Sequence, residues 1–314
     1  MANDKISSLR SVASVGECMI ELSASASGWQ MGHAGDAFNT LWNLRALLPE
    51  TVDTDFVSAF GTDPFSDQQI AFMASNNIGV AASPRLPLFH PGLYAISLDG
   101  AERSFTYWRS QAVARRLADD AGLLRASLKA RQLIYFSGIT LAILDDAGRR
   151  AFLDAVALAG KEGALIAFDP NYRSRLWASE VDARSAIGDA LAYVDIALPT
   201  FADEQALHGD HAPHDTATRL SLAGAKEVVV KDGPEAALVK NAEVSETVPA
   251  LHVENPLDTT GAGDSFNGGY LAARLLGMEP LAAVERAHRV AAATIQVRGA
   301  LAPQSMLRSA FEAA

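Results

Sequence analysis

The sequence contains a single cysteine, Cys18, so no disulfide can form within the chain. A chain without disulfides suits a reducing compartment. No apolar run approaches the roughly 18 residues that a membrane-spanning helix requires, and residues 1–5 lack the hydrophobic region of a secretion signal. These absences predict a cytoplasmic protein that does not enter a membrane.

Basic residues are outnumbered and scattered. Lysine and arginine total 26 against 37 aspartate and glutamate residues, which gives a net charge of −11, and no basic run occurs. Such a chain is a poor partner for nucleic acid or for an anionic membrane surface. If it binds anionic small molecules, it must concentrate its arginines locally, which draws attention to Arg103, Arg109 and Arg173.

Hydrophobic residues make up 49% of the 314 residues, enough for a large core in one large or two small domains. From about residue 132, apolar strands alternate with helical runs. The expected strands are residues 133–136, 164–168, 194–198 and 227–231, each followed by polar residues. In an open parallel sheet that carboxyl edge binds ligands, and right-handed crossovers place helices on both faces. We predict a single α/β domain over residues 1–314.

Between residues 84 and 107 the alternation of strands and helices is interrupted. Short apolar-polar runs at 93–98 and 103–108 are joined by Asp99-Gly100, which predicts a β-hairpin. Tyr107 and Arg109 are two positions apart, so a strand would place both on one face. In a chain of alternating strands and helices, this insertion looks like a small β lid.

The stretch with the clearest chemistry is residues 258–269. Gly261, Ala262 and Gly263 carry little or no side chain, and Asp264 directly precedes a helical run over residues 265–276. A loop of small residues that enters a helix leaves free backbone N–H groups at the positive end of the helix dipole, which is an anion site. A carboxylate would repel phosphate there, so we expect Asp264 to accept a proton from an alcohol while the loop holds the phosphoryl group.

Two nucleotide-binding loops and one ordinary helix start compete with this interpretation. A dinucleotide fingerprint needs a third glycine where this chain has Phe266, and an apolar strand before the loop. A Walker A loop needs Gly-Lys-Ser or Gly-Lys-Thr, which does not occur. An ordinary helix N-terminus, with Asp264 as a common first-turn residue, also accounts for residues 261–264. The longer pattern must therefore decide between a helix start and a phosphate site.

That longer pattern, Asp-Thr-Thr-Gly-Ala-Gly-Asp at positions 258–264, resembles the second signature of the ribokinase-like (PfkB) sugar kinases. A second loop of small residues precedes the helical run 41–48, where Asp36 alone would suggest only a helix cap. Its residues Ala34, Gly35, Asp36 and Asn39 look like the first signature of the same family. The resemblance implies a three-layer α/β/α fold with a mostly parallel sheet and a small β lid, formed by segments near 17–34 and 84–110.

The resemblance covers residues 12–303 and is closest to the 2-keto-3-deoxygluconate kinase branch. It is carried by the blocks at positions 16–23, 91–94, 107–109, 137–144 and 169–178. A sugar acid brings a carboxylate, for which the donor fork of arginine is suited. The branch therefore implies an ATP-dependent phosphotransferase that acts on the C6 hydroxyl of 2-keto-3-deoxygluconate, with Asp264 as general base.

The same resemblance implies which residues bind the phosphoryl group, the substrate, ATP and Mg²⁺. The anion hole is Gly261, Ala262 and Gly263. The substrate-binding residues are Gly35, Asp36, Asn39, Tyr94, Tyr107, Arg109 and Arg173. The ATP contacts are Asn171, Lys231, Gly233, Gly261 and Gly263, and Asp203 is assigned to Mg²⁺ through a water molecule. A monovalent cation, and a homodimer formed through the lid, are left open.

Three departures from the family pattern occur: Ala34 and Ala37 in the first signature, Thr200 and Asp203 in place of an Asn-x-x-Glu element, and Ser174 after Arg173. Because of Ala34 and Ala37, the family pattern does not determine the exact substrate contacts. A kinase of a neutral sugar such as fructose or ribose is the main alternative, and it predicts that Arg109 and Arg173 point away from the substrate. The second alternative is a non-catalytic nucleotide or sugar sensor with the same fold.

Overall fold

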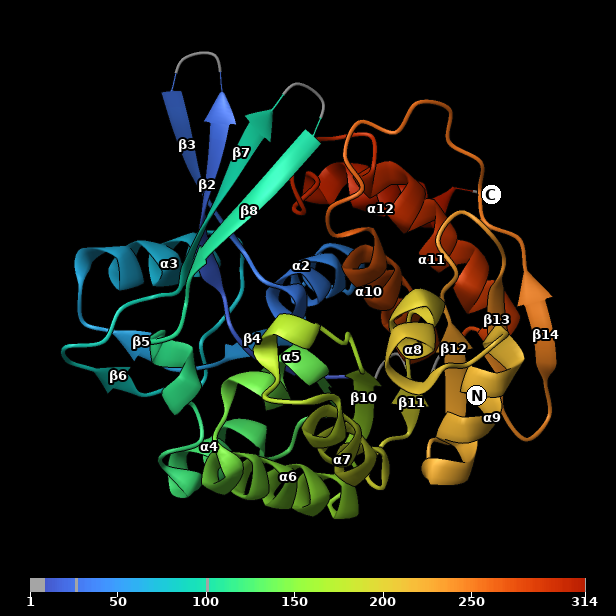
Figure 1. Cartoon of the computed structure of the whole chain (residues 1–314), viewed down its shortest axis with the longest axis horizontal. Coiled ribbons are helices and arrows are strands. Elements are labelled where there is room, and N and C mark those ends of the chain that lie inside the picture. Colours follow the sequence, from blue (N-terminus) through green and yellow to red (C-terminus); the bar gives the residue numbers. More distant parts are fainter. Residues whose placement is uncertain (1–8, 26–27, 100–101, 314) are drawn as a thin grey trace.

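The computed structural model describes residues 9–25, 28–99 and 102–313. Within these residues the main sheet has eight strands in the order β14-β13-β12-β11-β10-β9-β1-β4 (Figure 1). The parallel strands are β1 (Ser11–Val15), β4 (Asp53–Val57), β9 (Leu133–Ser137), β10 (Leu165–Asp169), β11 (Ile196–Ala197) and β12 (Glu227–Val230). An antiparallel edge follows, made of β13 (Ala237–Lys240) and β14 (Ser245–Val248). The predicted mostly parallel α/β sheet is confirmed.

Helices cover both faces of this sheet, because side chains of successive strand residues point to opposite faces. Val12, Leu133 and Tyr135 belong to one buried cluster, and Ala13 and Ile134 belong to the other. The first cluster includes side chains of α2 (Asp36–Leu47), α3 (Pro64–Ser75), α10 (Ala262–Leu275), α11 (Pro280–Thr294) and α12 (Gln304–Glu312). The second includes side chains of α4 (Ala121–Leu128), α5 (Gly138–Ile143), α6 (Asp146–Lys161), α7 (Glu180–Leu191), α8 (Phe201–His208) and α9 (Pro213–Ala223).

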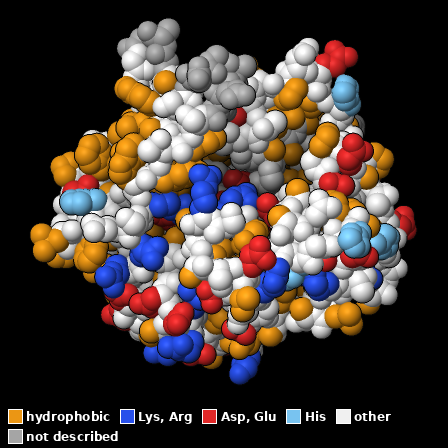
Figure 2. Space-filling view, in the orientation of Figure 1, with side chains coloured by type: hydrophobic (Ala, Val, Ile, Leu, Met, Phe, Trp, Pro, Cys, Tyr) orange, Lys and Arg blue, Asp and Glu red, His pale blue; other side chains and the backbone are white. Residues whose placement is uncertain are grey.

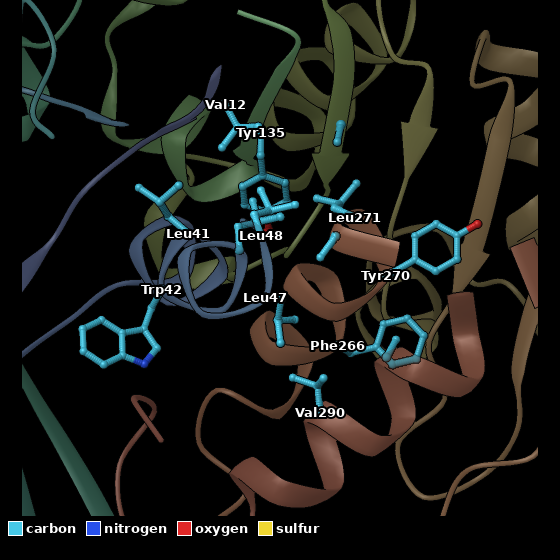
Figure 3. Packing of buried hydrophobic residues seen from close by; sticks show 14 of the residues in the cluster. Val12, Leu41, Trp42, Leu47, Leu48, Tyr135, Phe266, Tyr270, Leu271 and Val290 are labelled. Carbon is cyan, nitrogen blue, oxygen red and sulfur yellow. The ribbon is translucent and has the colours of Figure 1, made fainter. Parts of the chain in front are cut away.

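Helix α2 is buried on nearly every side, and its buried residues include the polar Asn39, Asn43 and Arg45. Figure 3 shows its Leu47 beside the ribbon of α10, in the same buried cluster as Leu271 of α10. Close packing depends on Gly268, because a Cβ there would lie 2.4 Å from the Cβ of Asn43 on α2. This packing fixes the N-terminus of α2 relative to that of α10.

A smaller four-stranded sheet stands apart from the main sheet (Figure 1). Its order is β3 (Gly28–Ala34), β2 (Met19–Ser25), β7 (Leu93–Asp99) and β8 (Glu102–Trp108). The two hairpins β2–β3 and β7–β8 are antiparallel, whereas β2 and β7 pair in parallel. The predicted small β-sheet is therefore present, although Gly100 of the expected turn lies outside the described residues.

Residues 55–60 do not form one continuous strand. The main-sheet strand β4 ends at Val57, and β5 (Phe60–Gly61) belongs to a separate pair with β6 (Arg85–Leu86). The chain leaves the main sheet where Ser58 N–H donates to Ser83 Oγ at 3.0 Å instead of to a neighbouring strand. Two short 3₁₀ turns, η1 (Val113–Arg116) and η2 (Ser174–Leu176), complete the elements. In the part of the chain that is described, no helix is long and apolar enough to cross a membrane.

Candidate active site

A cavity of about 960 Å³ lies between the small sheet and the carboxyl edge of the main sheet. Tyr94 and Tyr107 line it from the small sheet, and Gly35, Asp36 and Asn39 line it from the start of α2. Its other walls include four arginines, Arg109, Arg115, Arg173 and Arg175. Figure 2 shows basic side chains gathered at the centre of this face. An acidic chain therefore does concentrate its arginines in one cavity.

The starts of α2 and α10 meet at this cavity, and each is preceded by a glycine. Gly261 has φ +76, and a Cβ there would lie 2.7 Å from the Cβ of Ala300, so both its backbone conformation and the space around it require glycine. Asp36 and Asp264 occupy the first turns of the two helices. The positive N-terminal ends of α2 and α10 and the carboxylates of Asp36 and Asp264 thus lie close together.

Asp264 is held by a neighbour on the other helix. Asn39 Nδ2 donates to Asp264 Oδ2 at 2.8 Å, while Asn39 Oδ1 accepts from Gly35 N–H at 3.3 Å. Asn39 lines the cavity and Asp264 itself does not, so the carboxylate lies directly behind a lining residue. Burial, followed by the negative charge of Asp36, raises the pKa of Asp264 to about 7. A carboxylate with that pKa is suited to accept a proton near neutral pH.

A buried polar network supports the site from behind. Lys231 Nζ donates to Asp169 Oδ2 at 2.7 Å and to Asn267 Oδ1 at 2.8 Å. Asn267 Nδ2 donates to Asp169 Oδ2 at 2.8 Å. On its other oxygen, Asp169 accepts from Asn171 N–H at 3.0 Å, and Asn171 Nδ2 donates to Asp36 Oδ2 at 2.7 Å. Lys231 is thereby connected to the Asp36 carboxylate through fixed side chains.

Of the residues predicted to contact a nucleotide, some lie close to one another and others do not. A Cβ on Gly263 would lie 3.7 Å from Lys231 Nζ, so the start of α10 lies within van der Waals reach of an ammonium group. The N–H of Ala262 donates to Thr259 O at 3.2 Å in this conformation. Gly233 lies in the exposed turn after β12 with φ +56 and is not among the residues that line the large cavity.

On the small sheet, Tyr94 and Tyr107 are cross-strand neighbours with stacked rings whose centroids are 5.6 Å apart. The Tyr94 hydroxyl donates to Glu21, a partner that sequence reasoning did not identify. Burial and the charge of Glu21 raise the pKa of Tyr94, so its phenol stays protonated. The guanidinium of Arg175 lies 5.8 Å from the centroid of the Tyr107 ring. The two tyrosines form one fixed wall of the cavity.

The two arginines singled out in the sequence both line the cavity, and both have carboxylate partners. Arg109 forms an ion pair with Glu17, which is almost fully buried. Arg173 Nη1 lies 2.9 Å from Asp203 Oδ2, so the residue expected near Mg²⁺ is bonded to a residue expected near the substrate. The side chain of Arg103 is not among those that the structure describes. Glu17 and Arg115 were missed, although Glu17 falls within a block that carried the family resemblance.

Comparison with known proteins gives consistent matches over the whole chain. The sequence model described as pfkB family carbohydrate kinase matches residues 9–306. A 2-dehydro-3-deoxygluconokinase of Dickeya dadantii (strain 3937) is 40% identical over 301 residues, which cover 94% of this chain and 97% of that protein. The protein of the same name in Escherichia coli (strain K12) is 38% identical over 305 residues, or 95% and 99% of the two chains.

Solved structures show the same architecture. A crystal structure from E. coli, described as a ribokinase II in complex with ATP and Mg²⁺, matches with a TM-score of 0.81 at 25% identity, covering 96% of this chain and 99% of that one. The predicted ribokinase-like fold, with its mostly parallel main sheet and smaller second sheet, is confirmed by this likeness.

Proposed function

Because the chain belongs to the pfkB family of carbohydrate kinases, we propose that it is an ATP-dependent kinase of a sugar acid, with 2-keto-3-deoxygluconate (also named 2-dehydro-3-deoxygluconate) as substrate and the C6 hydroxyl as acceptor. The single observation that carries this proposal is the cavity beside Asp264, which holds four arginines although the chain has a net charge of −11. A neutral sugar has no need of that charge, whereas a carboxylate in a partly closed site does.

In this proposal the acceptor hydroxyl loses its proton to Asp264. The buried carboxylate is oriented by Asn39, and its raised pKa matches the task of a general base near pH 7. The start of α10, with the N–H groups of Gly261, Ala262 and Gly263, carries the negative charge that develops as the phosphoryl group moves. Positioning and charge stabilisation dominate such reactions, because little covalent chemistry falls to protein groups.

The chain's residues fit a nucleotide and Mg²⁺. The Lys231 ammonium beside Gly263 and the N-terminus of α10 suit a phosphate, and Asn171, Lys231 and Gly233 would hold ATP together with the glycine loop. Within the described residues, no group of three or more His, Cys, Asp or Glu could cage a metal ion. Mg²⁺ commonly binds through one or two carboxylates and substrate phosphates, and we assign Asp203 to it through a water molecule. ATP supplies the phosphoryl group, and Mg²⁺ neutralises its charge.

For the sugar acid, Gly35, Asp36 and Asn39 would bind the hydroxyls, since they line the cavity beside Asp264. The carboxylate and keto end would lie toward the small sheet, which then acts as a lid, held by Tyr94, Tyr107, Arg109 and Arg173. The position of Arg109 and Arg173 in the cavity wall argues against a neutral-sugar kinase, which needs neither charge there.

The test of this function is a substrate comparison. We expect ATP-dependent phosphorylation of 2-keto-3-deoxygluconate and little turnover of fructose, ribose or gluconate, measured by coupled ADP release with mass detection of the product. Preferential turnover of fructose or ribose would leave the kinase assignment standing and refute the substrate. ATP binding without transfer to any of the four would favour the sensor alternative.

We further propose that the outer face of the lid joins two copies of the chain. Strand alternation places Trp29, Met31 and Trp108 on the face opposite Tyr94, and these side chains are 57%, 47% and 59% exposed. Large apolar side chains gathered on one exposed face mark an interaction surface. We expect light scattering after gel filtration to give twice the 33.2 kDa chain mass.

A charged substitution on the outer face of the lid tests the proposed dimer interface. Met31→Glu is expected to yield monomer, whereas Leu222→Glu, at an equally apolar residue that is 85% exposed on α9, is expected to leave the dimer intact. A monomeric wild-type chain, or a Met31→Glu variant that still forms the dimer, would refute the proposed interface.

A further inference from the structure

The charges in the cavity wall are not equally available to a ligand. Arg109 is paired with Glu17 and Arg173 with Asp203, so each of these pairs is close to neutral. Glu17 is almost fully buried, and burial raises its pKa even with Arg109 beside it. If a substrate carboxylate displaced Glu17 from Arg109, a buried carboxylate would lose its counter-charge.

Arg115 differs from these two arginines. It lines the large cavity and also an adjoining cavity of about 690 Å³ near Tyr107 and Ser110. In the part of the chain that the structure describes, its guanidinium has no ion pair and no hydrogen bond. It is half-buried, whereas Arg175 is exposed and lies over the Tyr107 ring. Arg115 therefore offers a guanidinium that no carboxylate contacts directly within the described residues, although its charge also acts on the buried Glu17.

The backbone around Arg115 is fixed. It belongs to the 3₁₀ turn η1, whose Val113 and Ala114 are buried. Val113 N–H donates to His90 O at 2.9 Å, and Ala112 N–H donates to Arg109 O at 3.2 Å, which ties η1 to the residues that follow the lid strand β8. A cation mounted on a fixed segment loses less freedom when it binds than one on a mobile loop.

A second donor lies in the same wall. Within the described residues, Nε of Arg109 is buried and has no hydrogen-bond partner, although Arg109 keeps its ion pair with Glu17. A carboxylate that accepts from this Nε–H and from Arg115 would satisfy a buried donor and gain a counter-charge, and the pair between Arg109 and Glu17 would stay intact.

We propose that Arg115 is the residue that selects a sugar acid, by binding the substrate carboxylate together with the Nε–H of Arg109. The inference rests on the proposed sugar-acid kinase function and names its specificity-determining cation. Arg109 then serves as a donor already held in place by Glu17, and Arg173 is left to contact the keto end of the substrate.

The test compares two adjacent arginines in the full-length chain. Arg115→Ala is expected to raise KM for 2-keto-3-deoxygluconate about 10- to 100-fold, the range for losing a hydrogen bond to a charged group, with KM for ATP unchanged. Arg116 is the matched control, because it is exposed, lies 3.5 Å from Asp119 and stacks on Phe89. Arg116→Ala is expected to behave as wild type, and Arg115→Lys is expected to recover part of the affinity.

Calorimetric binding of 2-keto-3-deoxygluconate separates this inference from the proposed function, because it needs no turnover. Binding that is lost in Arg115→Ala supports the inference, even if the wild-type chain transfers no phosphate and the kinase proposal fails. If wild type phosphorylates the sugar acid and Arg115→Ala matches Arg116→Ala, the inference alone is overturned. Absence of binding to wild type overturns both.

Discussion

Replacing Asp264 with asparagine is expected to lower kcat by about 100- to 10,000-fold, the range that a positioned general base contributes. The amide keeps the shape of the side chain and can still accept from Asn39 Nδ2, so the contact between α2 and α10 should persist. What disappears is the ability to take the proton of the attacking hydroxyl. KM for ATP should change little, because the N–H groups of the glycine loop are unaffected.

The measurement is steady-state turnover of 2-keto-3-deoxygluconate, with thermal unfolding as a check on folding. Asp189→Asn is the matched control, since it makes the same chemical change at an exposed position on α7 and is expected to leave kcat unchanged. If Asp264→Asn kept most of the wild-type kcat, another group would have to be the base.

The pH profile of the wild-type chain gives a second readout of the same residue. kcat/KM reports ionisations of the free enzyme, and the raised pKa of Asp264 is about 7. A base works only when deprotonated, so kcat/KM should fall as the pH drops through about 7 and level off above it. A profile flat on the acid side down to the ordinary range of aspartate would contradict this assignment.

Replacing Lys231 with methionine is expected to lower the free energy of unfolding by about 3–5 kcal/mol, the range for removing one partner of a buried ion pair. Lys231 and Asp169 are 7% and 3% exposed, so the remaining carboxylate would stay away from water without a counter-charge. Methionine fills similar space, which confines the effect to the lost ammonium.

Urea unfolding followed by circular dichroism measures this change. The control is Lys226→Met, because Lys226 pairs with Asp195 at 2.6 Å but is largely exposed, and exposed pairs contribute about 0–1 kcal/mol. Adding Asp169→Asn to Lys231→Met should recover part of the loss, since no buried charge then remains. Equal effects of the Lys231 and Lys226 changes would refute the role assigned to the network.

The two ligand loops could be predicted because each is a short continuous stretch. Small residues before a helical run indicate a helix N-terminus locally, although α10 and α2 begin at Ala262 and Asp36, earlier than the expected runs at 265 and 41. That the two ends touch could not be predicted in this way. The bond from Asn39 to Asp264 joins residues 225 positions apart, and it depends on how α2 and α10 pack.

The partners of the charged residues were also beyond sequence reasoning. Glu21 and Tyr94 are neighbours only because β2 and β7 pair in a particular register. The pattern along either strand contains no information about that register. The sequence likewise indicated that Arg109 is available to a ligand, whereas the structure pairs it with Glu17. Strands β13 and β14, the antiparallel edge of the main sheet, were not among the expected strands.

The parallel pairing of β2 with β7 is a contact between distant parts of the chain. Ile20 lies beside Leu93, so this pair closes a long loop that contains α2 and β4. Closure becomes favourable once those elements are already packed, because the ends of the loop are then held close together. Helix α2 in turn packs against α10, near the other end of the chain. The cavity therefore depends on elements from both ends of the chain, and a chain whose synthesis stops before α10 has no complete site with which to bind a ligand.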